Sequence, residues 1–432
     1  MPRRHDHLFD RIAGFQALHA AARRAVKGKR KKSAAASFFA NLESELLALE
    51  KQLRGGEYRP GRYVAFEIND PKKRIVSAAP FRDRVVHHAL CAVIEPIFER
   101  GFIDTTFANR VAKGTHRAIE AYERFRDRHA HVLRCDIYRY FPAIDHSILK
   151  FAFRRRIMCP RTLALLDLIV DGSNAQEPVE LHFDGDDLFA PFQRRRGLPI
   201  GNLTSQFFAN LYLDDFDHFA TELLRAPYVR YVDDFALFHD NPAVLAGWRF
   251  RIEQYLVGRR LKLHPRKTMI SSCAAPSLFL GFELYADGRR SLPEDNVRRF
   301  HNRLRGLRDQ WRAGTVELGD VDARVWAWIA HAEHADTWRL RHAIFRGGRY
   351  NPAKTPEAWT APCRRVVRGD SWNNDPQNLR AAYRNRTPPT TGTTTLAFGS
   401  GARFPPEPTR SRSRRASTKR PGPSMMSTDA GA

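Results

Sequence analysis

The feature that most constrains this chain is a pair of adjacent acids between two apolar runs. Asp233 and Asp234 lie between residues 228–232 and residues 235–238, both of which are mostly β-branched, aromatic or otherwise apolar. Such runs around a short turn predict a β-hairpin. Two carboxylates side by side at its tip repel each other and lose solvation, a cost that packing does not offset. A solvated turn is the ordinary interpretation of an Asp-Asp pair, but the apolar flanks favour a site for hard divalent cations, the usual partners of phosphoryl transfer.

A third carboxylate, Asp136, stands at the end of another predicted strand. Within residues 131–137, alternation places Asp136 on one face with Arg134, while the other face is apolar. An Asp that closes a mostly apolar strand either starts a turn or is a ligand at the strand's carboxyl end. Asp145 is the better candidate for starting the turn. Asp136 is therefore the predicted third ligand.

With these acids in order, the chain resembles a reverse transcriptase over about residues 57–285. The resemblance implies an α+β right-hand polymerase fold, with fingers, a palm on an antiparallel sheet and a helical thumb. It implies an RNA-directed DNA polymerase, a nucleotidyltransferase that uses two Mg²⁺ ions or Mn²⁺ in their place. Asp136, Asp233 and Asp234 are then catalytic and bind metal together with Ile137. In such a mechanism one ion would lower the pKa of the primer 3′-hydroxyl and the other would hold the triphosphate. The two ions of such sites lie roughly 3.5–4 Å from each other.

The same resemblance assigns roles to residues around the acids. Lys267 would be a catalytic residue that protonates the leaving pyrophosphate, and Phe141 would exclude a ribonucleotide 2′-hydroxyl. Phe279, Leu280 and Gly281 resemble the primer-grip turn. The residues expected to contact the incoming nucleotide are Lys72, Lys73, Arg74, Arg110, Lys113, Phe141, Ile200, Gly201 and Gln206. A solvated charge run is the alternative for the basic members of this set.

The stretch 196–206 indicates which kind of reverse transcriptase this is. Retroviral and group II intron enzymes carry Gln where this chain has Ile200, and intron enzymes usually end the motif in Ser-Pro rather than Ser205-Gln206. This form, like residues 108–116, resembles the reverse transcriptases of diversity-generating retroelements. Those enzymes copy a template-repeat RNA with errors opposite adenine, and the cDNA replaces a variable repeat in a target gene. The implied partners are template RNA, a DNA or RNA primer, dNTPs and a small basic accessory variability protein.

Two other classes compete with this interpretation. A group II intron or retron-type reverse transcriptase is the first, but an intron enzyme is expected to continue into a maturase region, which residues 349–432 do not resemble. A non-catalytic RNA-binding relative is the second. It would be expected to have substitutions among the three acids, and all three are present.

The C-terminal tail adds a separate resemblance. Residues 365–386 resemble the end of a formylglycine-generating-enzyme-type C-type lectin domain, a familiar target of these retroelements. We hypothesise that the reading frame runs into the template repeat, since the asparagines of this segment have codons that begin with two adenines. A vestigial fusion or a chance tail is the alternative. Residues 387–432 are rich in Pro, Thr, Ser and Gly, which predicts disorder.

Composition agrees with a polyanionic partner. The 432-residue chain has a formal net charge of +25, although basic charge alone does not distinguish nucleic acid from an anionic membrane. No apolar run approaches the roughly 20 residues of a spanning helix, and the N-terminus lacks a secretory segment, so no membrane partner is expected. The five cysteines are scattered without metal-ligand spacing. A reduced, cytoplasmic setting is the simplest inference.

The predicted organisation is a basic helical extension (1–56), fingers (57–127), a palm (128–291, with about 150–193 returning toward the fingers), a thumb (292–348) and a tail (349–432). Apolar spacing predicts one helix over residues 205–224 with Phe208, Leu211, Phe216, Phe219 and Leu223 on its core side. The acidic loop 184–187 is expected to face solvent. Residues 331–334 are expected on a helix surface, and Trp326, Trp328 and Trp338 in the thumb core.

Overall fold

The computed structural model describes residues 4–30, 32–68, 73–173 and 182–346. The predictions for Lys72, for residues 365–386 and for residues 387–432 therefore lie outside the described residues. Four helices occupy the N-terminal part: α1 (Phe9–Ala13), α2 (Phe15–Ala25), α3 (Ser33–Ala40) and α4 (Leu42–Gly55). The first three pack on the long helix α5 (Phe81–Glu99), and α4 packs on those three. Gly56 ends α4 in the left-handed conformation that glycine adopts freely.

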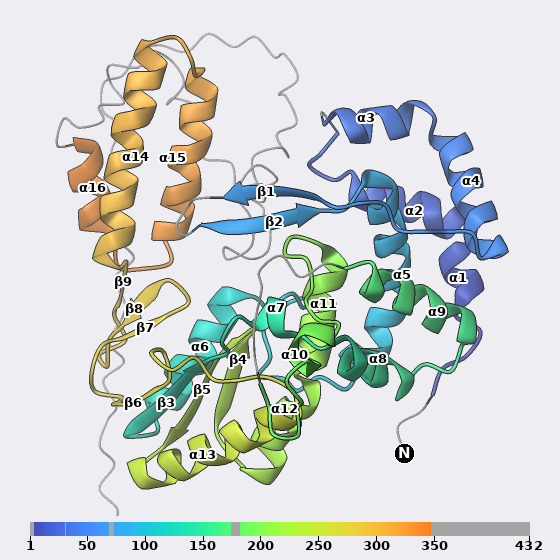
Figure 1. Cartoon of the computed structure of the whole chain (residues 1–432). Helices are drawn as coiled ribbons and strands as arrows, with labels where there is room; N and C mark the ends of the chain where they lie inside the picture. The colour runs from blue at the N-terminus through green and yellow to red at the C-terminus, as the bar shows by residue number, and fades with distance from the viewer. Residues whose placement is uncertain (1–3, 31, 69–72, 174–181, 347–432) are drawn as a thin grey trace, which may run out of the picture. The chain divides into compact units, whose positions relative to one another are not determined.

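Strands from the middle of the sequence form a four-stranded antiparallel sheet, called the central sheet below (Figure 1). Its order is β4 (Tyr228–Tyr231), β5 (Asp234–His239), β3 (His131–Asp136) and β6 (Met269–Ser272). The predicted hairpin is confirmed, because β4 pairs with β5 with Tyr231 opposite Asp234. Helix α13 (Pro242–Gly258) packs on β3 and β5, and α6 (Thr115–Arg126) packs on β4. The expected α+β class with an antiparallel sheet is thus confirmed.

Between β3 and β4 the chain forms a set of short helices. They are α7 (Tyr140–Ala143), α8 (His146–Arg154), α9 (Pro160–Asp171), α10 (Ala190–Gln193), α11 (Leu203–Tyr212) and α12 (Asp214–His218), followed by a π-helical turn at Phe219–Leu223. Asp145 caps α8 by accepting bonds from the amides of Ser147 and Ile148 at 2.8 and 3.1 Å, which matches its predicted role as a turn starter.

The prediction of one helix over 205–224 is wrong in its continuity. The helix breaks at Leu213, and a π turn at its end widens the spacing from 3.6 residues per turn. Leu223, which the helical period placed in the core, is 67% exposed as a result, whereas Phe208 and Phe216 are buried. The acidic loop also differs in part from expectation, because Asp186 is mostly buried and ion-paired with Arg194.

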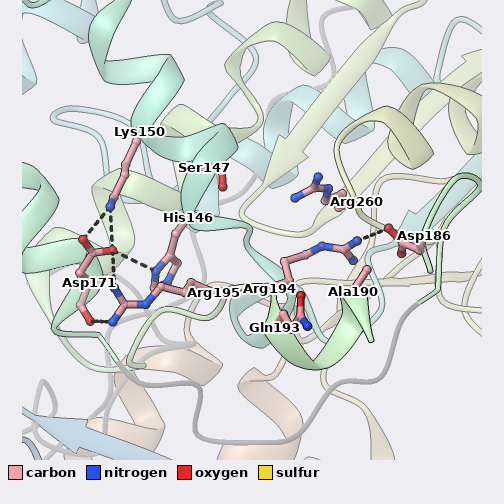
Figure 2. A pocket seen from close by; sticks show the side chains of 10 residues that line it. All are labelled: His146, Ser147, Lys150, Asp171, Asp186, Ala190, Gln193, Arg194, Arg195 and Arg260. Atoms are coloured by element: carbon pink, nitrogen blue, oxygen red, sulfur yellow. Dashed lines mark hydrogen bonds and ion pairs between the residues drawn. The ribbon is translucent and has the colours of Figure 1, made fainter. Parts of the chain in front are cut away.

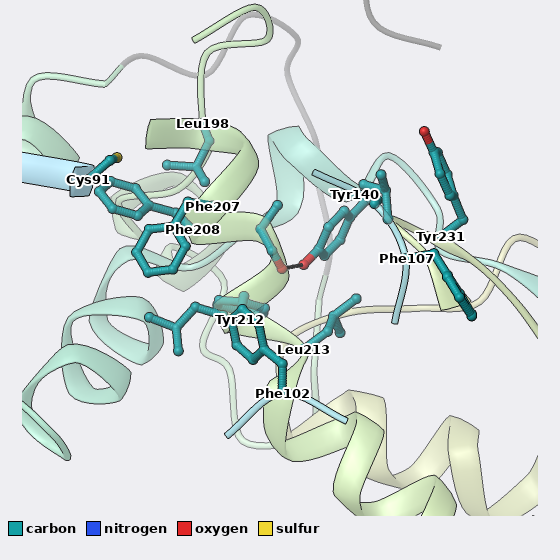
Figure 3. Packing of buried hydrophobic residues seen from close by; sticks show 14 of the residues in the cluster. Cys91, Phe102, Phe107, Tyr140, Leu198, Phe207, Phe208, Tyr212, Leu213 and Tyr231 are labelled. Atoms are coloured by element: carbon teal, nitrogen blue, oxygen red, sulfur yellow. Dashed lines mark hydrogen bonds between the residues drawn. The ribbon is translucent and has the colours of Figure 1, made fainter. Parts of the chain in front are cut away.

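Aromatic side chains fill the core around α11. Figure 3 shows Phe207, Phe208 and Tyr212 of α11 in this core, with Tyr140 beside the same helix. The Tyr140 hydroxyl donates to the carbonyl of Ala209 at 2.5 Å. The segment that follows Asp136 is therefore fixed against α11, which follows Gly201 in the sequence.

Two smaller β elements flank this core. β1 (Val64–Ile68) and β2 (Arg74–Ala78) form an antiparallel hairpin. β7 (Ser277–Phe279), β8 (Phe282–Leu284) and β9 (Arg290–Ser291) form a three-stranded sheet, followed by α14 (Glu294–Arg312), α15 (Leu318–Ala332) and α16 (Trp338–Arg346). Among the helices of the described ranges, none is long and apolar enough to cross a membrane.

Two predictions for these last helices need correction. Trp328 is buried and stacks on Phe300 at 3.8 Å, but Trp326 and Trp338 are 36% and 44% exposed, so only one of the three is a core residue. Residues 331–334 are helix surface only at Glu333, which is exposed: His331 and Ala332 are buried, and the ring of His334 stacks on His116 with centroids 3.5 Å apart. Contact with α6 and β8 covers this end of α15, which helical periodicity alone does not reveal.

Candidate active site

The three acids predicted from the sequence meet at one end of the central sheet. Asp136 is the last residue of β3 and lies opposite Asp234, the first residue of β5, in the ladder. Asp233 occupies the hairpin tip, and its carbonyl accepts a bond from the amide of Ile137 at 3.2 Å. Val232 precedes it with a positive φ of 58°, which lets the hairpin reverse in a two-residue turn. Residues nearly 100 positions apart in sequence are thus brought together by strand pairing.

Their mutual repulsion is visible in the electrostatics. Burial first, and then the charge of Asp136, raises the pKa of Asp233 to about 6. Burial, the charges of Asp233 and Asp136 and a hydrogen bond with Asp136 raise the pKa of Asp234 to about 8. Lys267, which follows His264 in the loop before β6, places its Nζ 2.7 Å from Asp136 Oδ2. One ammonium group therefore offsets only part of the negative charge.

The donors at this site fit hard divalent cations in their chemistry. The side-chain donors are all carboxylate oxygens, and the raised pKa values of Asp233 and Asp234 indicate negative charge that a cation would relieve. Within the part of the chain that the structure describes, no three acidic, His or Cys side chains form a ready-made ligand cluster.

Two of the predicted nucleotide-binding cations lie on β2 or just before it. The positive charge of Arg74, the first residue of β2, acts on Asp233. Lys73 ion-pairs with Glu67 across the β1–β2 hairpin at 2.9 Å, and both side chains are largely exposed. The charge of Arg74 is therefore felt at Asp233, whereas Lys73 lies at the surface in a weak ion pair.

Arg110 and Lys113 are instead engaged with the loop that carries them. Arg110 is 9% exposed, and its guanidinium donates to Glu99 at 2.7 Å and to the carbonyls of Ile103 and Thr106. Lys113 donates to the carbonyl and carboxylate of Asp104 at 2.7 and 3.1 Å. These contacts hold the segment between α5 and α6, and this arrangement does not present the Arg110 guanidinium to a triphosphate.

The predicted stretch around Ile200 packs directly on β2. The carbonyl of Ile200 accepts from the amide of Ser77 at 3.1 Å. Gly201 has a φ of +104°, and a Cβ there would lie 2.6 Å from Val76 Cγ1. Leu198 donates to the carbonyl of Phe141 at 2.9 Å, so the stretch is held between β2 and α7. Gln206, half-buried on α11, belongs to the same unit.

The predicted primer-grip residues form the turn between β7 and β8. Leu280 and Gly281 both have positive φ, 47° and 86°, which closes the turn in two residues. Phe279 is buried, and its ring stacks on that of Tyr122 at 4.5 Å. The turn is therefore anchored to α6 and, through it, to the central sheet.

A charged pocket of about 420 Å³ lies among α8, the end of α9, α10 and the segment that follows α10 (Figure 2). Asp171 accepts from Lys150 at 2.7 Å and lies 3.4 Å from Arg195, while Arg194 pairs with Asp186. Four cations (Lys150, Arg194, Arg195 and Arg260) line the pocket with only two acids, so its charge is positive overall. The ion pairs of Arg194 and Arg195 hold this segment in place just before Gly197, whose amide donates to the carbonyl of Ile144 at 2.8 Å.

Sequence reasoning missed one charged residue beside the acids. Arg230 lies in β4 and is fully buried, paired with Asp217 of α12, which is also fully buried. The available signal was an arginine inside an otherwise apolar strand of the predicted hairpin, since a buried guanidinium requires a partner.

Comparison with known proteins identifies the class to which this fold and site belong. A family model described as reverse transcriptase (RNA-dependent DNA polymerase) matches residues 68–284, half of the chain. The chain belongs to the reverse transcriptase family and is an RNA-directed DNA polymerase. It is 26% identical over 330 residues to Protein YkfC of Escherichia coli (strain K12), a match that covers 65% of this chain and 84% of that protein.

Solved telomerase structures are also similar, at low identity. Telomerase from Candida albicans, in complex with a TWJ fragment of telomeric RNA, matches with a TM-score of 0.37 and 10% identity over 58% of this chain and 51% of that one. An apo telomerase from Candida tropicalis matches with a TM-score of 0.40 and 12% identity over 54% of this chain and 55% of that one. The chain spans about half the length of these telomerase chains.

Proposed function

We propose that this reverse transcriptase copies a template-repeat RNA into adenine-mutagenised cDNA for targeted protein diversification, by two-metal nucleotidyl transfer. The observation that carries the catalytic part is the meeting of Asp136, Asp233 and Asp234 at one sheet end, with the pKa values of the last two raised. Three acids held together at this cost in repulsion are suited to bind cations.

In this proposal each residue near the acids has a separate task. Asp136, Asp233 and Asp234, with Ile137, would hold two Mg²⁺ ions, or Mn²⁺, which when bound supply Lewis acidity at the primer hydroxyl and the triphosphate. Lys267, within hydrogen-bond distance of Asp136, is positioned to give a proton to the leaving pyrophosphate.

Other residues would select and orient the substrates. Arg74 would neutralise part of the triphosphate, and the ring of Phe141 would exclude ribonucleotides. The turn at 279–281 would support the primer end. Residues 57–127 would act as fingers, 128–291 as palm and 292–348 as thumb around template RNA and a DNA or RNA primer.

The retroelement type is supported by the Ile200–Gln206 pattern and by the tail resemblance at 365–386. A small basic accessory variability protein is the proposed partner in that setting. A group II intron or retron-type enzyme is the alternative within the same family, and it differs in an observable way. Its cDNA errors would not concentrate opposite template adenine.

Primer extension on an RNA template tests the catalytic proposal. Purified protein with Mg²⁺ and dNTPs should extend a DNA primer, and Asp233→Ala should reduce the rate by at least about 100-fold, because a metal ligand is lost. Asp287→Ala is the matched control: Asp287 is an exposed acid paired with Arg289, and its loss should leave the rate unchanged. Full activity in Asp233→Ala would refute the assignment of the site.

Sequencing the products tests the retroelement type. Misincorporation should be concentrated opposite adenine in the template, and the codons for 365–386 should have a neighbouring copy in a target gene that differs mainly at adenines. Errors spread evenly over the four template bases, with no such copy, would favour the intron or retron alternative.

A further inference from the structure

The hairpin that carries Asp233 and Asp234 rests on an ion pair that is fully buried from solvent. Arg230 Nε and Nη2 donate to the two carboxylate oxygens of Asp217 at 2.6 and 2.5 Å, and both side chains are fully buried. The bidentate geometry uses two of the five N–H bonds that the guanidinium offers. The Nη1 group of the guanidinium takes no part in this bidentate contact.

The Nη1 group instead contacts the turn that carries Asp233. Arg230 Nη1 donates to the carbonyl of Val232 at 2.9 Å. Val232 is β-branched, is buried, and has a φ of +58°, a conformation that such residues rarely adopt. Without outside support, the backbone there would relax toward negative φ and shift Asp233 and Asp234, which directly follow it.

The ion pair is itself held from several sides. Asp217 also accepts from the hydroxyls of Tyr228 at 2.8 Å and Thr106 at 2.9 Å, so its carboxylate receives four hydrogen bonds in all. The backbone of Arg230 is bonded on both sides, since its amide donates to Thr105 and its carbonyl accepts from Phe107, each at 3.0 Å. A fully satisfied buried network of this kind fixes geometry.

Arginine is the residue type that this arrangement requires. A planar fork can hold a carboxylate with two donors and still direct a third at a carbonyl on its other edge. Lysine would keep the charge but cannot satisfy both partners in fixed directions. An ion pair at this depth is not needed for stability alone, because apolar residues of similar size often replace such pairs at no cost.

We infer that the Arg230–Asp217 pair is a positioning device for the catalytic hairpin, fixing the carbonyl of Val232 so that Asp233 and Asp234 are set for nucleotidyl transfer. The inference rests on the proposed function of those two acids. Arg230 acts through the turn and is a positioning residue, not a catalytic one.

Three variants test it in the full-length protein. Arg230→Lys keeps the charge and loses the fork. Arg230→Met combined with Asp217→Asn removes both buried charges and guards against misfolding, because the amide oxygen can accept from one of the Tyr228 and Thr106 hydroxyls while the amide nitrogen donates to the other. Asp215→Asn is the matched control on the same helix, because Asp215 pairs with Arg155 and Arg259 and does not contact the hairpin.

We expect kcat for primer extension to fall about 10- to 100-fold in the first two variants, because a small displacement of reacting groups is costly. KM for template–primer should stay within about twofold, because we expect the hairpin tip to contribute little to binding of template–primer in the ground state. Hydrogen–deuterium exchange of a peptide covering residues 230–236 should accelerate in both variants. Asp215→Asn should change the melting temperature without changing kcat or this exchange.

Wild-type kcat and wild-type exchange at 230–236 in a folded double variant would overturn the inference. Equal losses of kcat in Asp215→Asn would also overturn it, because the effect would then be general to α12. Failure of the proposed function is distinguishable from both results. In that case Asp233→Ala would remain active, while the exchange measurement would still report whether Arg230 holds the turn.

Discussion

At the residue scale, Asp234 and Asp233 make stability depend on pH in a direction that is opposite to most carboxylates. Their pKa values are raised to about 8 and about 6 from 3.8 by burial and by neighbouring negative charge. A carboxyl group with a raised pKa binds its proton more tightly in the folded state. The stability it contributes is present below about pH 4 and is lost as pH rises to about 8.

The metal-free protein should therefore melt at a lower temperature as pH rises through this window. Asp214 and Glu95 also have pKa values raised to about 7, by burial first, so the wild-type curve alone is not diagnostic. The difference between wild type and Asp234→Asn isolates the site. The substitution should flatten the pH dependence, and added Mg²⁺ should raise the melting temperature of the wild type more at the high end of the window. Parallel curves for the two proteins would contradict this account.

Ile200 is the residue to which we attribute the proposed errors opposite template adenine. A glutamine at this position could hydrogen-bond the incoming nucleotide, and one polar contact is worth about 1–2 kcal/mol, or roughly tenfold in discrimination. Ile200→Gln should thus lower misincorporation opposite template adenine several-fold, as counted by sequencing cDNA. Leu188→Gln, at a residue 72% exposed and outside the site, serves as control. Unchanged error rates in Ile200→Gln would remove the explanation.

At the element scale, the approach of β2 to the 196–206 stretch depends on Gly201. A side chain there would meet Val76 and would be strained at φ +104°. Asn202 reinforces the contact, because its side chain bonds the amide of Ala79 and the carbonyl of Ser77. A change at this junction should therefore move β2, and Arg74 with it, away from the acids.

Gly201→Ala should cost about 1–3 kcal/mol of unfolding free energy and raise KM for dNTPs. Urea unfolding and steady-state kinetics measure the two effects. Gly247→Ala is the control: Gly247 is exposed within α13 with open space around it, so alanine should stabilise the helix by up to about 1 kcal/mol and leave KM unaltered. Similar behaviour of the two variants would count against a special role for Gly201.

At the scale of the whole molecule, the net charge of +25 leads us to expect salt-dependent binding of RNA. Neutralising phosphates releases counterions, so affinity should fall by about 10³-fold or more between about 50 mM and 200 mM salt if six or more phosphates are contacted. Fluorescence anisotropy with a labelled RNA measures the slope. Asp233→Ala should keep the same slope, because a carboxylate does not neutralise a phosphate. A shallow slope in the wild type would place most of the affinity outside electrostatics.

The sequence alone determined the hairpin, the strand that ends at Asp136 and the identity of the three acids. Alternating β-branched and aromatic residues and a short acidic turn are local signals, and local physics decides strand and turn. The family resemblance of the sequence also predicted the α+β class with an antiparallel sheet. It did not yield the break at Leu213, the exposure of Leu223 or the burial of His331, because these depend on which faces neighbouring elements cover.

Only the tertiary structure decided which charges serve the acids and which serve the scaffold. Arg74, Arg110 and Arg230 are the same residue type in the sequence, but their roles differ. Arg74 acts electrostatically on Asp233, Arg110 secures a loop, and Arg230 holds the turn at Val232. The physical reason is that a guanidinium takes its role from the acceptors within its reach. Those acceptors come from residues far away in the chain, and folding brings them into contact.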